Sequence, residues 1–125
     1  MRNRPKLTDI KVNLANGEAT AEVILTHRGE SLVGIAVGSD HDSARARLVG
    51  EATVRAVEQI NDDIGRIDLQ AIGTTELGPT QVAIAQVVVS SHAGELVGSA
   101  VLRSDETALA AARAVLDALN RVIVR

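Results

Sequence analysis

Aromatic side chains and cysteine are both missing from this sequence of 125 residues. With no Phe, Trp or Tyr, a buried core has to be filled by Ala, Val, Leu and Ile, which favours close spacing between helices and sheet. The aromatic platforms on which single-stranded nucleic acid usually stacks are also missing. The absence of cysteine excludes disulfides, a thiol nucleophile and thiolate metal sites.

Charge of one sign and long apolar runs are scarce as well. The 13 Lys and Arg residues face 16 Asp and Glu residues, which gives a net charge of −3 without a basic stripe. A mildly acidic domain repels phosphate backbones, so nucleic-acid binding is not expected. No apolar stretch approaches the roughly 18 residues of a membrane span, and the N-terminus carries no apolar signal core. We therefore expect a soluble cytoplasmic protein with no membrane partner.

What the sequence does contain is a repeat. Leu32-Val33-Gly34 recurs as Leu96-Val97-Gly98. An apolar run and a turn precede each copy, and both turns contain a His followed two residues later by Gly-Glu. A long amphipathic stretch comes after each copy, from Ser43 to Asn61 and from Thr107 to Val124. A long period repeated once indicates a duplicated unit with pseudo-symmetry rather than a solenoid.

The first copy has the pattern of three strands and a helix. Apolar residues alternate with polar ones at positions 10–14, and Asn16-Gly17 predicts a hairpin turn into a strand over Thr20–Thr26. A turn at residues 28–31 leads into a third strand over Leu32–Val37. The following helix has an apolar stripe with helical spacing, formed by Leu48, Val49, Ala52, Ala56, Val57 and Ile60.

The second copy repeats this order. Ile67, Leu69 and Ala71 match Ile10, Val12 and Leu14 in the first copy, and a longer connecting loop follows over Gly73–Thr80. Strands are expected at about 81–90 and 95–102, before a helix whose apolar face comprises Leu109, Ala112, Leu116, Leu119, Val122 and Ile123. The sequence therefore predicts an α+β fold with helices packed on antiparallel sheet, as one domain over residues 1–125 with βββα units at 7–61 and 66–125.

Four of the predicted strands are apolar at both alternating positions: residues 23–25, 32–37, 82–89 and 96–102. Such strands are usually covered on both faces. Two helices can cover only one face of a six-stranded sheet, so the other face or an edge needs a partner. We therefore predict a homodimer.

Several segments resemble the C-terminal regulatory domain of isopropylmalate synthase and its relative citramalate synthase. Ala114–Arg121 is similar to the family's closing helix, and Gly98–Asp105 to its glycine-bearing third strand and the Ser/Thr-Asp that precedes the helix. Further similarity lies in Leu69–Gly73, Val82–Ala85, Gly34–Gly38 and Asp42–Ala44.

The resemblance implies two βββα units, dimerisation and binding of an end-product amino acid. We expect no catalytic barrel before this domain, so the synthase reaction is not carried over. The family's Gly-Pro before the first helix is replaced by Ser39-Asp40-His41, and its Asp-Ala in the second unit's loop by Pro79-Thr80. These departures imply a ligand pocket that has changed its ligand or closed.

Catalytic and metal sites have only weak candidates. Asp40-His41-Asp42 contains metal-ligand types without a fourth ligand, and a solvated helix cap is the favoured interpretation. His27 and His92 occupy related turns. They could form a symmetric pH-sensitive pair, or they could simply be kept from one ancestral hairpin turn that was duplicated. In Ser90-Ser91-His92, adjacent strand residues point to opposite faces and cannot form a relay. Neither an enzyme nor a cofactor is expected.

We therefore expect a non-catalytic regulatory or dimerisation module that binds a small metabolite such as a branched-chain amino acid. The alternative is a ligand-free homodimeric adaptor that acts on another protein. A ligand site is expected between the two units or across the dimer, where related turns converge. Its predicted residues are Ile72, Gly73, Thr74, Glu76, Gly78, Thr80, Ser39, Asp40, Ser104 and Asp105.

Overall fold

The computed structural model describes residues 4–60, 65–103 and 107–123. The chain forms two units, each with three antiparallel strands followed by a helix. The first comprises β1 (Lys6–Ala15), β2 (Glu18–His27), β3 (Glu30–Ser39) and α1 (Asp42–Val57). The second comprises β4 (Ile67–Leu77), β5 (Thr80–Val89), β6 (Glu95–Val101) and α2 (Thr107–Ile123). The predicted α+β fold of two βββα units is confirmed.

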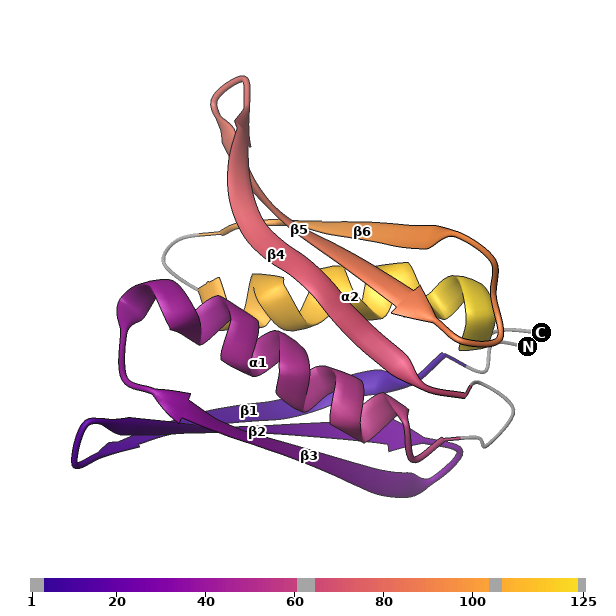
Figure 1. Cartoon of the computed structure of the whole chain (residues 1–125), viewed down its shortest axis with the longest axis horizontal. Coiled ribbons are helices and arrows are strands. Elements are labelled where there is room, and N and C mark those ends of the chain that lie inside the picture. The colour runs from indigo at the N-terminus through magenta and orange to yellow at the C-terminus, as the bar shows by residue number, and fades with distance from the viewer. Residues whose placement is uncertain (1–3, 61–64, 104–106, 124–125) are drawn as a thin grey trace.

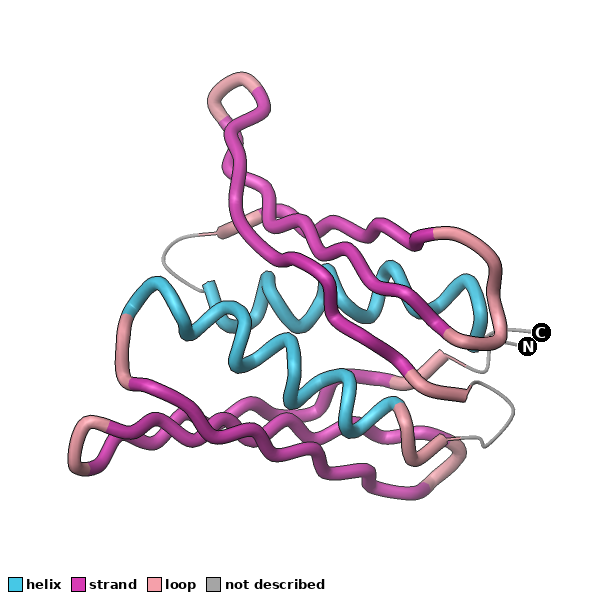
Figure 2. Tube along the Cα trace, viewed as in Figure 1, coloured by secondary structure: helices cyan, strands magenta, loops and turns pink. Residues whose placement is uncertain are grey.

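The sheets do not join into the six-stranded sheet that we expected. Each unit has its own three-stranded sheet, with strand orders β1-β2-β3 and β4-β5-β6. Both helices lie between the two sheets, so the molecule has three layers (Figures 1 and 2). Helix α1 contacts its own strands β2 and β3 and also β4, while α2 contacts β5, β6 and β1. Each sheet therefore has one face on the helices and one outer face.

Tight turns set the hairpins of the first sheet. Asn16 and Gly17 have φ values of 56° and 78°, and Arg28 and Gly29 have 53° and 81°. Two successive residues with positive φ produce the turn whose twist matches paired strands. The Asn16-Gly17 turn was predicted from sequence and is confirmed.

The predicted loop over Gly73–Thr80 is wrong. Residues up to Leu77 belong to β4, and β5 begins at Thr80, so Gly78 and Pro79 alone form the turn. Gly78 has a φ of 61°, which a two-residue hairpin turn with glycine first requires. The inserted residues extend the hairpin instead of forming a loop, and its tip projects beyond the helices (Figure 1).

The glycines of the Leu-Val-Gly repeat lie where each helix crosses its sheet. A Cβ atom at Gly34 would collide with the Ala52 carbonyl oxygen and lie 2.6 Å from the Ala56 nitrogen. At Gly98 it would collide with the Ala114 carbonyl oxygen and the Ala118 nitrogen. Backbone therefore packs directly on backbone, which is how a core without aromatic residues stays closely spaced.

The core is built from aliphatic side chains on the inner faces of both sheets and on both helices. Helix α2 is buried on most of its circumference because it lies between the two sheets and beside α1. Its predicted apolar residues are buried or partly buried, and Arg113, Asp117 and Arg121 are exposed as expected. Helix α1 ends at Val57, earlier than the predicted Asn61. No helix in the described part of the chain is long and apolar enough to cross a membrane.

Candidate functional site

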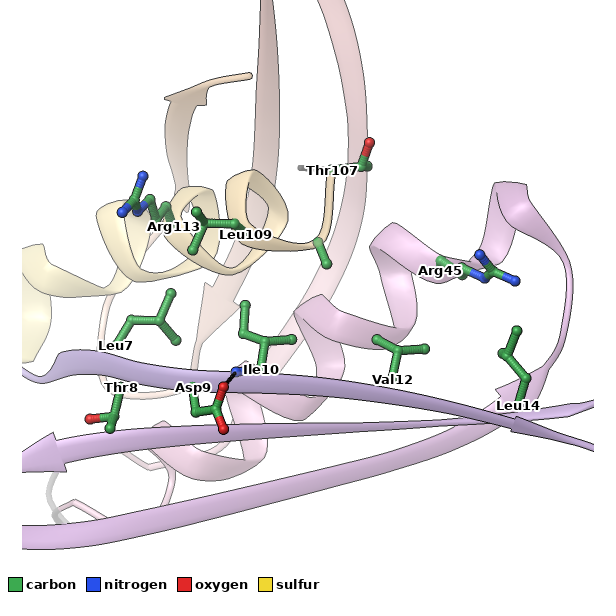
Figure 3. A pocket seen from close by; sticks show the side chains of 11 residues that line it. Leu7, Thr8, Asp9, Ile10, Val12, Leu14, Arg45, Thr107, Leu109 and Arg113 are labelled. Atoms are coloured by element: carbon green, nitrogen blue, oxygen red, sulfur yellow. Dashed lines mark hydrogen bonds between the residues drawn. The ribbon is translucent and has the colours of Figure 1, made fainter. Parts of the chain in front are cut away.

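A groove lies between β1 and α2, one element from each unit. It has a volume of about 770 Å³. Ile10, Val12 and Leu14 project from β1 towards the two helices and form an apolar floor (Figure 3). Leu7 and Leu109 continue the apolar wall at the α2 end. Such a groove can take an apolar group that lies along β1.

Polar groups lie at the ends of the groove rather than in its centre. Arg113 of α2 lies at one end and Arg45 of α1 at the other (Figure 3). Arg45 is bound to Asp40 by an ion pair of 2.9 Å. Arg113 is exposed and forms no hydrogen bond or ion pair with any residue described in the structure. Arg113 can therefore accept an external anion at no cost to an internal contact.

The corresponding contact in the other half of the molecule, between α1 and β4, has its strand edge covered. The Arg47 guanidinium donates a hydrogen bond of 2.8 Å to the Leu69 carbonyl oxygen. The Ile67 N–H donates to the Glu58 carboxylate over 3.2 Å. Side chains of α1 and of its C-cap residue Glu58 thus form hydrogen bonds with backbone groups on the free edge of β4.

Helix α2 has no equivalent side chains. The pairs Ala52/Ala56 and Ala114/Ala118 pack on the equivalent glycines, which aligns the two helices residue by residue. In this alignment Leu109 takes the place of Arg47, and Asn120 that of Glu58. The Asn120 side-chain oxygen is buried without a hydrogen-bond partner among the described residues. The groove beside β1 is therefore a specific departure from the pseudo-symmetry.

The importance of the α1–β4 contact can be measured with Arg47→Ala. We expect unfolding free energy to fall by about 1.5 kcal/mol, because a hydrogen bond from a charged donor is lost along with an exposed ion pair of 3.0 Å to Glu51. Urea denaturation followed by circular dichroism measures this loss. The matched control is Arg121→Ala on α2, because Arg121 is exposed and lies outside this contact. A loss as large as that of Arg47→Ala would contradict the interpretation.

The residues predicted for the ligand site do not line this groove. Ile72, Gly73 and Thr74 lie together in a shallow depression on β4 and β5, of about 310 Å³. Glu76, Gly78 and Thr80 lie at the exposed hairpin tip. Ser39 and Asp40 lie before α1, where the Asp40 N–H donates to the Gly17 carbonyl oxygen over 3.1 Å. Ser104 and Asp105 lie outside the described residues.

The segment Asp40-His41-Asp42 does not assemble a site either. The Asp40 carboxylate pairs with Arg45, and His41 occupies the N-cap position of α1 with no capping hydrogen bond from its side chain. The segment thus lies at the N-terminus of α1, where the sequence places a helix cap, and His41 contributes no side-chain hydrogen bond to it. Within the described ranges, no group of three His, Cys, Asp or Glu side chains could hold a metal ion.

Sequence reasoning missed the groove because the groove lies where α2 has no side chains equivalent to Arg47 and Glu58. The strand match given above was also shifted: Ile10 faces Val23 and Leu69 faces Val87, at the same position of the repeat, so Ile10 corresponds to Leu69 and not to Ile67. A β-bulge interrupts each of the two strands, between Leu7 and Asp9 in β1 and between Leu69 and Ala71 in β4. Comparison of Arg47 with Leu109 in the helix alignment is the signal that could have found the site.

Comparison with models of known protein families gives no match for this chain. Comparison with curated protein sequences gives none either.

Proposed function

We propose that the protein is a non-catalytic regulatory module that binds a small apolar carboxylate in the groove between its two units. The observation that carries the proposal is the open groove of about 770 Å³ beside β1, at the place where the other half of the molecule has only a hollow of about 280 Å³ lined by Arg47 and Glu58. Its position between two units and its apolar floor are typical of small-molecule sites. The resemblance to the isopropylmalate synthase regulatory domain supports a metabolite as the ligand class.

The chemistry of the groove favours a branched-chain keto acid over the corresponding amino acid. Ile10, Val12 and Leu109 provide contacts for a branched aliphatic group, and the Arg113 guanidinium suits a carboxylate. An ammonium group also needs an acceptor. The Asp9 carboxylate points away from the floor of the groove (Figure 3) and accepts a hydrogen bond of 2.9 Å from the Ile10 N–H. A ligand without an ammonium group therefore fits better.

A thermal-shift screen tests the proposal. Keto acids derived from leucine, isoleucine and valine should raise the melting temperature by several degrees at millimolar concentration, because a ligand at ten times its Kd stabilises by about 1.4 kcal/mol. The parent amino acids should give smaller shifts. Circular dichroism is the suitable probe, since the chain has no aromatic residue.

Arg113→Gln should abolish the shift and leave the melting temperature of the free protein unchanged within about 2 °C. Arg121→Gln is the matched control, since Arg121 is exposed on the same helix and outside the groove. If neither acid class shifts the transition of the unmodified protein, the metabolite proposal is abandoned.

The second candidate is a ligand-free homodimeric adaptor. It is favoured by the outer face of β3, where Val33, Ile35 and Val37 are 39%, 49% and 56% exposed. A row of exposed β-branched residues on one strand is typical of a surface that contacts another protein. This candidate takes precedence if the thermal-shift screen fails.

A further inference from the structure

The free edge of β1 differs from the other three sheet edges of the molecule. On β3, the Val33 carbonyl oxygen accepts a hydrogen bond of 2.7 Å from Gln59. On β6, the Ser99 N–H donates to Asp117 over 3.0 Å. On β4, Arg47 and Glu58 occupy the edge. Among the described residues, no helix side chain forms a hydrogen bond with the backbone of β1, and the edge of this strand is open to pairing at Val12 and Leu14.

The backbone groups on this edge belong to Ile10, Val12 and Leu14. A two-residue turn at 16–17 closes on the pair Ala15–Glu18, whose N–H and C=O groups bond to each other. Hydrogen-bonded pairs then alternate along the strand, which leaves the groups of even-numbered residues 10–14 directed away from β2. The Ile10 N–H accordingly bonds to the carboxylate of Asp9 and not to β2.

The same three residues send their side chains into the groove. Ile10 and Val12 are half-buried there, and Leu14 is 48% exposed. Lys11 and Asn13 lie on the opposite face of the strand and are exposed. From residue 10 to residue 14 the pattern is apolar, polar, apolar, polar, apolar, and it reads the same in both directions about Val12. A strand of this kind is complementary to an antiparallel copy of itself.

We propose that a second copy of this chain pairs on the edge of β1, antiparallel, with Val12 facing Val12 of the second copy. Ile10 then faces Leu14 of the second copy on the groove side, and Lys11 faces Asn13 on the outer side. Shifting the strands by one pair would bring the two Lys11 side chains opposite each other, and like charges in direct opposition destabilise a sheet. Full pairing requires Asp9 to release the Ile10 N–H.

This pairing also extends the groove. The second copy adds its own Ile10, Val12 and Leu14 beside those of the first, and these extend the apolar floor beyond the edge of β1. The inference deepens the proposed function, because it identifies the partner that enlarges this floor. Its test uses no ligand, so it can fail or succeed independently of the metabolite screen.

Light scattering coupled to gel filtration, at tens of micromolar protein, should give the mass of a dimer. Val12→Pro should give a monomer, because proline removes the N–H that faces the second copy. The fold should persist, since this N–H is not part of the β1–β2 ladder and proline is tolerated on the outer side of an edge strand. Ile35→Lys on the outer face of β3 is the control and should remain a dimer. A monomeric unmodified protein, or a folded dimer with Val12→Pro, overturns the proposal.

Cysteine substitution tests the register even if Val12→Pro does not fold, and the chain has no cysteine of its own to interfere. Facing residues of a hydrogen-bonded antiparallel pair have Cα atoms about 5.5 Å apart, within the range that a disulfide spans. Val12→Cys should therefore form a covalent dimer under mild oxidation. Lys11→Cys and Val33→Cys should not, and cross-linking at either position in preference to Val12 overturns the proposed register.

Discussion

Replacing Gly98 by alanine is expected to reduce the unfolding free energy by about 3 kcal/mol or more, and Gly34→Ala should do the same. In both cases the added Cβ would collide with helix backbone, which cannot move aside as a flexible side chain can. Inserting even small groups into a well-packed interior typically costs about 1–3 kcal/mol, and a backbone obstacle places these two sites at or above the top of that range. Urea denaturation followed by circular dichroism gives the loss directly.

Gly73→Ala is the matched control for these variants. Gly73 also lies in a strand, but a Cβ atom there would meet nothing within 4 Å. Because alanine restricts the unfolded chain more than glycine, Gly73→Ala should be neutral or slightly stabilising. Equal losses at Gly73 and Gly98 would contradict the role assigned to the close helix–sheet crossing.

Leu119→Ala should cost about 3 kcal/mol of unfolding free energy, since leucine-to-alanine changes in cores typically cost about 2–5 kcal/mol. Leu119 is fully buried and is among the largest such side chains of a core that has no aromatic residue. It lies on α2, between the two sheets, so the cavity would open in the middle layer.

Leu77→Ala provides the comparison for Leu119→Ala, because Leu77 is 73% exposed at the tip of the β4–β5 hairpin. Its effect on the unfolding free energy should stay within about 0.5 kcal/mol. Chemical denaturation of both variants under the same conditions measures the difference. If Leu119→Ala were as mild as Leu77→Ala, the middle layer would have to be loosely packed, contrary to its burial.

The local patterns in the sequence predicted the units well because each depends on neighbouring residues. Asn16-Gly17 favours positive φ on its own, and the helical spacing of apolar residues from Leu109 to Val122 is a local property of the chain. The repeat of Leu-Val-Gly marked the glycines correctly, although their reason, contact with helix backbone, emerged only from the structure.

The arrangement of the sheets and the groove could not be predicted in the same way. Whether β4 extends the first sheet or packs against α1 depends on contacts such as Arg47 with Leu69, which are distant in sequence. Residues 73–77 are predicted as part of a long connection that contains Gly78-Pro79, yet they pair with β5 residue by residue. The groove depends on a difference between the two helices, Arg47 and Glu58 against Leu109 and Asn120, whereas the repeat is recognised from the residues that the two units share.

The placement of both helices between the two sheets has a consequence for how such a protein could arise. Helix α1 contacts β4 of the second unit, and α2 contacts β1 of the first, so each unit covers part of the other's helix. A single unit made by itself would leave one side of its helix exposed to water. A half-length ancestor would therefore have needed a second copy of itself to cover that side of its helix. Duplication and fusion of its gene would make this contact intramolecular.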